Sequence, residues 1–192
     1  MGLTAYGKPR YLDKLIGPVL RLGEDGAFTL NQRLFDFCSP ERHYAPALIN
    51  HLGIPPRPPG GQMREEHQDL ASSVQQALEI AVGKILVRLI RDYETRDFCF
   101  AGGVALNCTA NAQVIRDLGI RSHIHPAAGD AGGAMGAALQ SAMRGREGGP
   151  PHRYRFSPYL GIRYPEPVIR TTLSVNQIPY RQSADVAGEI AD

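Results

Sequence analysis

Two adjacent glycines at a strand-to-helix junction are the strongest chemical signal in the sequence. They lie in the stretch AGGVALN at residues 101–107, which follows an apolar segment. Because Gly102 and Gly103 lack a Cβ, their N–H groups can approach a ligand closely, and a following helix presents its positive end to phosphate or ribose. Asn107 is placed where its amide can reach a nucleotide or a carbonyl group. The spacing alone fits equally a nucleotide-binding turn and a tight turn that needs glycine for packing.

A second signal is Asp130, in the stretch PAAGDAGGAMGAA at residues 126–138. An acidic residue at the mouth of a helix can hold a divalent cation through its carboxylate oxygens. Asp130 can also be a plain helix N-cap, and without further ligands the cap is the better interpretation. The glycines that flank it do not have the spacing of the dinucleotide fingerprint, so a Rossmann dehydrogenase is disfavoured. We expect them to allow close packing of the helix.

Other polar groups give weaker signals. His67, Gln68 and Asp69 are expected to form the solvated or capping first turn of a helix. His123 and His125 alternate on one short strand and are more typical of a surface or packing feature than of a metal site. The sequence contains neither a phosphate-binding P-loop nor a serine nucleophile elbow, and no catalytic residue is assigned.

The three cysteines indicate a reducing compartment. Their number is odd and their spacing is not that of a metal knuckle, which favours a cytoplasmic protein without disulfides. Cys99 is expected to be an inert core thiol in an apolar strand. Cys108, at the start of a helix, is assigned to packing rather than catalysis.

Composition limits the partners. With 21 Lys+Arg against 19 Asp+Glu the formal net charge is +2, so nucleic-acid binding is not indicated. No apolar run approaches the ~20 residues that span a bilayer, and the N-terminus does not resemble a signal peptide. We therefore expect neither membrane insertion nor secretion.

The elements that must position these groups follow from hydrophobic periodicity. One apolar stripe at three- and four-residue steps predicts a long amphipathic helix over 64–93; its members are Leu70, Val74, Ala77, Leu78, Ala81, Ile85 and Leu89. Strands are predicted at 97–101 and 122–125, and helices at 104–118 and 131–143. This alternation is typical of an α/β layered domain with parallel strands.

The ends of the chain are less regular. A turn at 25–26 leads into a predicted strand, and the proline-rich stretch 53–61 is predicted to be a loop. Residues 144–157 are predicted to be a linker. Beyond them we expect a helix at 165–173, a strand at 179–182 and a helix from 184. Because that last element begins at the end of the sequence, we expect the chain to be a fragment.

Five motifs in one order carry a resemblance to a known family. The chain resembles the O-carbamoyltransferases of the nodulation-protein U and tobramycin-carbamoylating type, which are related to the tRNA threonylcarbamoyl transferase. The motifs are MGLTAYG (1–7), HQDLA with VQ (67–75), AGGVALN (101–107), PAAGDAG (126–132) and SPYLG (157–161).

The resemblance implies an actin-like, sugar-kinase-like (ASKHA) α/β fold. Residues 1–143 would be part of the carbamoyl-transfer domain, and residues 158–192 the start of a C-terminal activating α/β domain. Gly102, Gly103 and Asn107 would contact ATP or carbamoyl adenylate, and Asp130 would be one ligand of a divalent metal, usually iron. The carbamoyl adenylate, made from carbamoyl phosphate and ATP, would supply a carbamoyl group to a hydroxyl or amine of a small molecule such as a secondary metabolite.

The sequence also departs from the family pattern. The family's His-x-x-x-His metal pair does not occur in this chain and would precede Met1, while the activating domain would continue beyond Asp192. We therefore expect part of a transfer site, inactive alone. The alternative is a non-catalytic nucleotide-binding remnant or subunit, and the acceptor cannot be read from the sequence.

Overall fold

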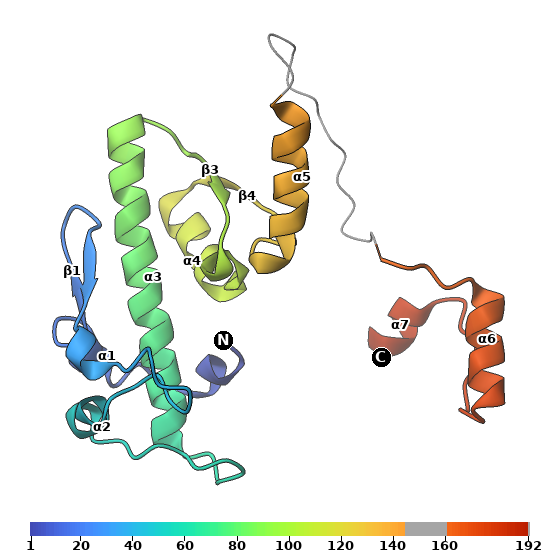
Figure 1. The fold of residues 1–192 in the computed structure, drawn as a ribbon, viewed down its shortest axis with the longest axis horizontal. Coiled ribbons are helices and arrows are strands. Elements are labelled where there is room, and N and C mark those ends of the chain that lie inside the picture. Colours follow the sequence, from blue (N-terminus) through green and yellow to red (C-terminus); the bar gives the residue numbers. More distant parts are fainter. Residues whose placement is uncertain (145–160, 192) are drawn as a thin grey trace. The chain divides into compact units, whose positions relative to one another are not determined.

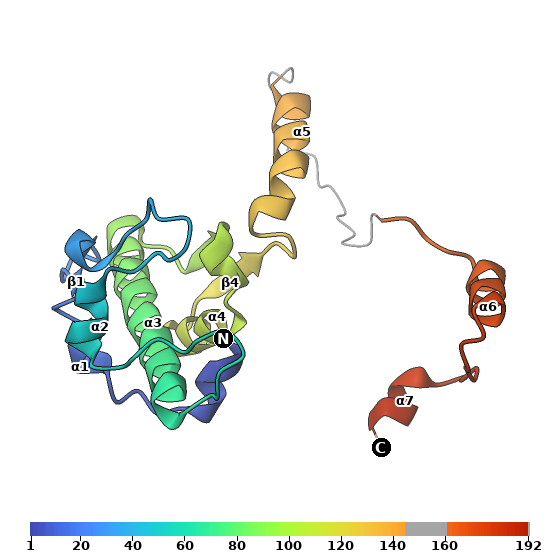
Figure 2. The same ribbon diagram turned by 60° about the horizontal axis from the view of Figure 1, so that its bottom comes forward.

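One long helix, α3 (Glu65–Tyr93), organises the first part of the molecule (Figure 1). The structure is a computed structural model that describes residues 1–144 and 161–191. η1, α1 and α4 all pack against α3, and the second view also shows α1 and α4 on different sides of it (Figure 2). The helix predicted over 64–93 is therefore confirmed. By length and composition α3 could also cross a membrane, a test that core helices of soluble proteins pass as well.

Residues 1–63 form small elements against α3. Their apolar core contains Leu15, Val19, Leu34, Leu52 and Ile54 together with Ala77 of α3. β1 and β2 pair antiparallel around the predicted turn, and α2 ends at Gly53 in the left-handed conformation before the predicted loop. The elements are η1 (Gly2–Tyr6), α1 (Leu12–Leu15), β1 (Leu20–Leu22), β2 (Phe28–Leu30), η2 (Gln32–Leu34) and α2 (Pro46–Leu52).

The residues after α3 form a βαβα unit. β3 and β4 pair in parallel, from Asp97 opposite Arg121 to Phe100 opposite Ile124. A second core joins Leu86 of α3 to α4. The α/β class with parallel strands is thus confirmed, although the described residues form two sheets of two strands each. The elements are β3 (Asp97–Phe100), η3 (Gly103–Leu106), α4 (Cys108–Leu118), β4 (Arg121–Ile124), η4 (Asp130–Gly132) and α5 (Gly133–Met143).

Several sequence expectations for this unit are wrong. The helix predicted over 104–118 is interrupted at Asn107, whose side-chain oxygen accepts the N–H of Ala110 and starts α4 as a separate helix. Cys99 is exposed and is no core thiol, because the two-stranded sheet is covered on the face of Phe98 and Phe100 while Cys99 points to the other face. Cys108 is likewise exposed.

A salt bridge joins the beginnings of the two parallel strands. Arg121 of β4 donates two hydrogen bonds to the carboxylate of Asp97 on β3. The guanidinium lowers the pKa of Asp97 below its usual value. A lowered carboxyl pKa stabilises the folded state above the pKa of the unfolded chain, and this contribution is lost as the pH falls through the folded value. Because both side chains are largely exposed, the effect is small.

Asp69 is the buried anchor of the N-terminal segment, and not part of a solvated first turn. It is 2% exposed and accepts the backbone N–H of Lys8 at 2.7 Å, while Arg10 lies 3.0 Å from its other oxygen. Ser73, one turn later and fully buried, accepts the N–H of Tyr11. His67, by contrast, does cap α3, since its Nδ1 accepts the N–H of Arg64.

We expect Asp69→Ala to lower the free energy of unfolding by about 2 kcal/mol, because it leaves the N–H of Lys8 without its acceptor, whereas Arg10 keeps its ion pair with Glu65. Urea denaturation of the 192-residue chain measures this. Asp36→Ala, at an exposed position, is the control. A loss below about 1 kcal/mol for Asp69→Ala would mean that the segment is held by its apolar contacts instead.

Contacts divide the chain into two units, Met1–Gly149 and Pro150–Asp192. The described part of the second unit contains α6 (Glu166–Val175) and α7 (Val186–Ala191). The strand predicted at 179–182 is wrong, since these residues have no regular structure and Pro179 lacks an N–H for a sheet. Residues 145–157 of the predicted linker lie outside the described residues. The domain boundaries inferred from the sequence stay predictions.

Candidate functional site

The two predicted motifs meet at the carboxyl ends of the parallel strands. The turn after β3 contains Gly102 and Gly103, and the loop after β4 leads to Asp130. The N–H of Gly102 donates to the carbonyl of Ala128 at 2.8 Å, and a Cβ on Gly129 would lie 3.9 Å from the Cα of Gly103. Because parallel strands end at the same edge, residues distant in sequence share one face there, where α/β proteins bind ligands.

The backbone of the glycine turn is open. Gly102 has φ +94°, a conformation that other residues adopt only with strain, which explains this glycine from the backbone alone. Gly103 has no such requirement, and a Cβ placed on it meets no atom within 4 Å. Packing therefore gives no reason for a glycine at position 103. The open space beside it leaves room for a nucleotide, whose contact with Gly102 and Gly103 stays a prediction.

Asn107 is already engaged in hydrogen bonds. Its Oδ1 accepts from the N–H of Ala110 and from Gln75 Nε2, both at 3.1 Å, and its Nδ2 donates to Gln75 Oε1 at 2.8 Å. Gln75 Nε2 also donates to Glu79, the next turn of α3. A direct contact of Asn107 with a nucleotide, which stays a prediction, would compete with these partners. Its observed role is to fix the turn between η3 and α4.

Gln75 is the residue that the sequence analysis missed. It is 8% exposed and bonds to Asn107 through both atoms of its amide, which ties α3 to the start of α4. A signal was present, because Gln75 is a polar residue between the apolar Ala71 and Leu78 on the same side of α3. Its partner, 32 residues away, could not be inferred from that pattern.

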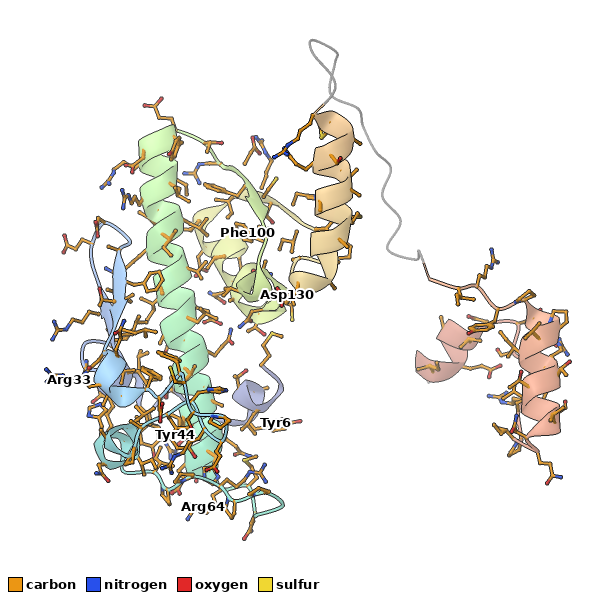
Figure 3. The ribbon with its side chains drawn as sticks, in the orientation of Figure 1. Tyr6, Arg33, Tyr44, Arg64, Phe100 and Asp130 are labelled. Carbon is orange, nitrogen blue, oxygen red and sulfur yellow. The ribbon has the colours of Figure 1, made fainter. Side chains whose placement is uncertain are left out.

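Asp130 is exposed, beside the foot of α5 (Figure 3). The cap of η4 is Gly129, with no side-chain hydrogen bond, so the plain N-cap interpretation of Asp130 is wrong. Within residues 1–144 and 161–191, the carboxylate of Asp130 makes no hydrogen bond or ion pair. The group is therefore available to a ligand.

A complete metal site is not formed by the described residues. They contain no group of three or more His, Cys, Asp and Glu side chains close enough to bind one ion. Asp130 alone does not satisfy the coordination of iron. His123 is exposed, and His125 Nδ1 accepts the N–H of Ala127. The donor set of this part of the chain thus does not fit a metal ion without ligands from elsewhere.

Residues 1–144 thus form a mixed α/β fold with a glycine turn and an acidic loop at one edge of a pair of parallel strands. The profile of the carbamoyltransferase N-terminus matches residues 1–139. The chain therefore belongs to the carbamoyltransferase family, as its motifs suggested. The matched residues include Gly102, Gly103, Asn107 and Asp130.

Curated relatives agree with this assignment. The chain is 34% identical over 200 residues to the uncharacterized protein sll1178 of Synechocystis, covering 100% of this chain and 32% of the relative. It is 30% identical over 203 residues to nodulation protein NolO of Bradyrhizobium diazoefficiens, covering 100% of this chain and 34% of that protein. Nodulation protein NolNO of Sinorhizobium fredii is 34% identical over 155 residues, or 76% of this chain and 21% of its own length. The chain thus spans between 21% and 34% of the length of these relatives.

Proposed function

We propose that this chain forms the nucleotide-facing edge of the transfer site in an O-carbamoyltransferase. The site would move a carbamoyl group from carbamoyl adenylate to a hydroxyl or amine of a small molecule. One observation carries the proposal: the Gly102–Gly103 turn and the loop before Asp130 are joined by a hydrogen bond at the ligand-binding edge of a parallel sheet. Membership of the carbamoyltransferase family supplies the chemical class. We further propose an actin-like architecture for the whole domain and a cytoplasmic location.

The reaction is an acyl transfer. The acceptor oxygen or nitrogen attacks the carbamoyl carbon, the bond from that carbon to the phosphate oxygen breaks, and AMP leaves with the bonding electrons. The acceptor's proton goes to a base that is not assigned. The backbone N–H of Gly103 stabilises the negative charge on the departing phosphate, while that of Gly102 already donates to Ala128 and holds the turn in place. Asn107 and Gln75 position this turn.

We expect Gly103→Val to weaken nucleotide binding at least tenfold, because its branched side chain fills the open space above the turn. Isothermal titration with ATP measures the affinity. Gly83→Val is the matched control, since a Cβ there also meets no atom within 4 Å but lies on α3 away from the turn. Equal affinities of the two variants for ATP would show that the nucleotide does not bind at the glycine turn.

The function itself is tested in a hybrid enzyme. The third of Bradyrhizobium NolO that matches this chain is replaced by the 192 residues, and AMP release is followed with carbamoyl phosphate and ATP. We expect release that depends on both donors and that Gly103→Val suppresses. A hybrid that folds and binds ATP without releasing AMP would favour the second candidate, a non-catalytic nucleotide-binding subunit. The incomplete set of metal ligands in the described residues is the observation in favour of that candidate.

A further inference from the structure

An apolar groove runs along α3 on the side of the β1–β2 hairpin and reaches η3. It encloses about 650 Å³ between α3, the β1–β2 hairpin, α1 and α2, and every residue that lines it is apolar. Its most open side chains are those of Phe28 on β2, Val104 after β3 and Val74 on α3, which are 58%, 55% and 52% exposed. Most residues of the apolar stripe predicted for α3 line this groove. Because the groove is open, part of the stripe is not covered by other described elements.

The chemistry of the groove excludes a small polar ligand. Pockets that bind metabolites contain a few polar groups that fix the orientation of the molecule, and this groove contains none. Its surface has the composition of a protein interior. An apolar surface that remains open in this way is typical of an interface with another protein segment.

The parallel sheet beside α3 also has a face that no other described element covers. In residues 1–144, β3 pairs with β4 and with no further strand. Parallel sheets are normally covered on both faces, yet Cys99 on one face of β3 is exposed. Val104, directly after β3, is 55% exposed and lines the groove. The groove therefore extends to η3, at the end of β3.

The length of the relatives indicates which polypeptide covers the groove. The groove is built from elements within residues 1–139, which the family profile matches, whereas this chain spans 32% and 34% of the two relatives that cover all of it. About two thirds of each of these relatives therefore lies outside the part that matches this chain. We propose that the groove is the docking surface for this remaining carbamoyltransferase polypeptide, which inserts an apolar face between α3 and the β1–β2 hairpin. The proposal concerns assembly and does not depend on the transfer reaction.

Co-expression tests the proposal. The 192-residue chain is produced together with tagged segments of the Synechocystis relative, namely the parts that lie outside its matched third. The relative's own matched third, produced in the same way, shows that the segments are competent to bind. We expect the chain to co-purify with the tagged segments, and its failure to do so where the relative's own third succeeds would overturn the proposal.

Two substitutions locate the contact. Val74→Asp and Phe28→Asp should each reduce co-purification at least tenfold, while Val87→Asp should leave it unchanged. Val87 is a close control because it lies on the same helix and is 53% exposed, but does not line the groove. The melting temperatures of the isolated variants should match that of the unchanged chain, since all three side chains are more than half exposed. Equal retention of all variants would place the contact elsewhere.

Other occupants give different results. If sedimentation shows a dimer of the chain that Val74→Asp dissociates, the groove belongs to a second copy and the proposal is wrong. If the chain binds neutral phosphatidylcholine vesicles and Val74→Asp prevents this, the groove faces lipid and the proposal is equally wrong. A monomer that ignores vesicles and captures the tagged segments supports it.

Discussion

Gly7→Ala is expected to lower the free energy of unfolding by about 3 kcal/mol. A Cβ on Gly7 would lie 2.1 Å from the carbonyl oxygen of Gln68 and 2.6 Å from the nitrogen of Asp69. These are backbone atoms of α3, which cannot turn aside as a side chain can. The N-terminal segment must therefore lift from the helix, which strains the hydrogen bond from Lys8 to Asp69.

The conformation of Gly7 makes this a test of contact alone. Its φ is −116°, which any residue adopts, so alanine brings no backbone strain. Gly2→Ala is the matched control, because it lies in the same segment and its Cβ would meet no atom within 4 Å. Urea denaturation of the two variants gives the comparison. Similar unfolding free energies of Gly7→Ala and Gly2→Ala would show that η1 does not pack closely against α3.

Asp130→Asn is expected to reduce carbamoyl transfer by the hybrid enzyme about 100-fold, with a matching loss of bound metal. Asparagine keeps the shape of the side chain but removes the formal charge that a hard or borderline cation prefers. Substitution of residues that only support metal ligands costs 10–100-fold, so the upper end is expected if Asp130 binds the metal together with ligands from the rest of the hybrid. Elemental analysis and AMP release measure the two quantities.

Stability separates this role from a structural one. Asp130 is exposed and caps no helix, so the melting temperature of the metal-free hybrid should be unchanged. Asp117→Asn, an exposed carboxylate near the end of α4, should change neither metal content nor transfer. Should Asp130→Asn retain its metal and its activity, the metal would have to be bound without Asp130.

The local elements could be predicted because their signals are local. The stripe at three- and four-residue steps located α3 to within one residue, and the glycine turn after an apolar strand located β3 and its parallel partner. The motifs also identified the family, which the profile match confirms. Errors occurred where a polar side chain bonds to the main chain. Asn107 interrupts the predicted helix by capping α4, a bond that hydrophobic periodicity does not reveal.

Tertiary structure alone decided which polar groups are buried and which apolar ones are open. Asp69 has the sequence context of a solvated first turn, but its partner Lys8 lies 61 residues away and comes close through the packing of η1 on α3. Asn107 and Gln75, 32 residues apart, are likewise joined by the packing of α3 on α4. The sequence determined the apolar stripe of α3, and the fold decided that Ala77 is covered while Val74 is not. Periodicity records which side of a helix is apolar, whereas coverage depends on segments that the rest of the polypeptide brings to it.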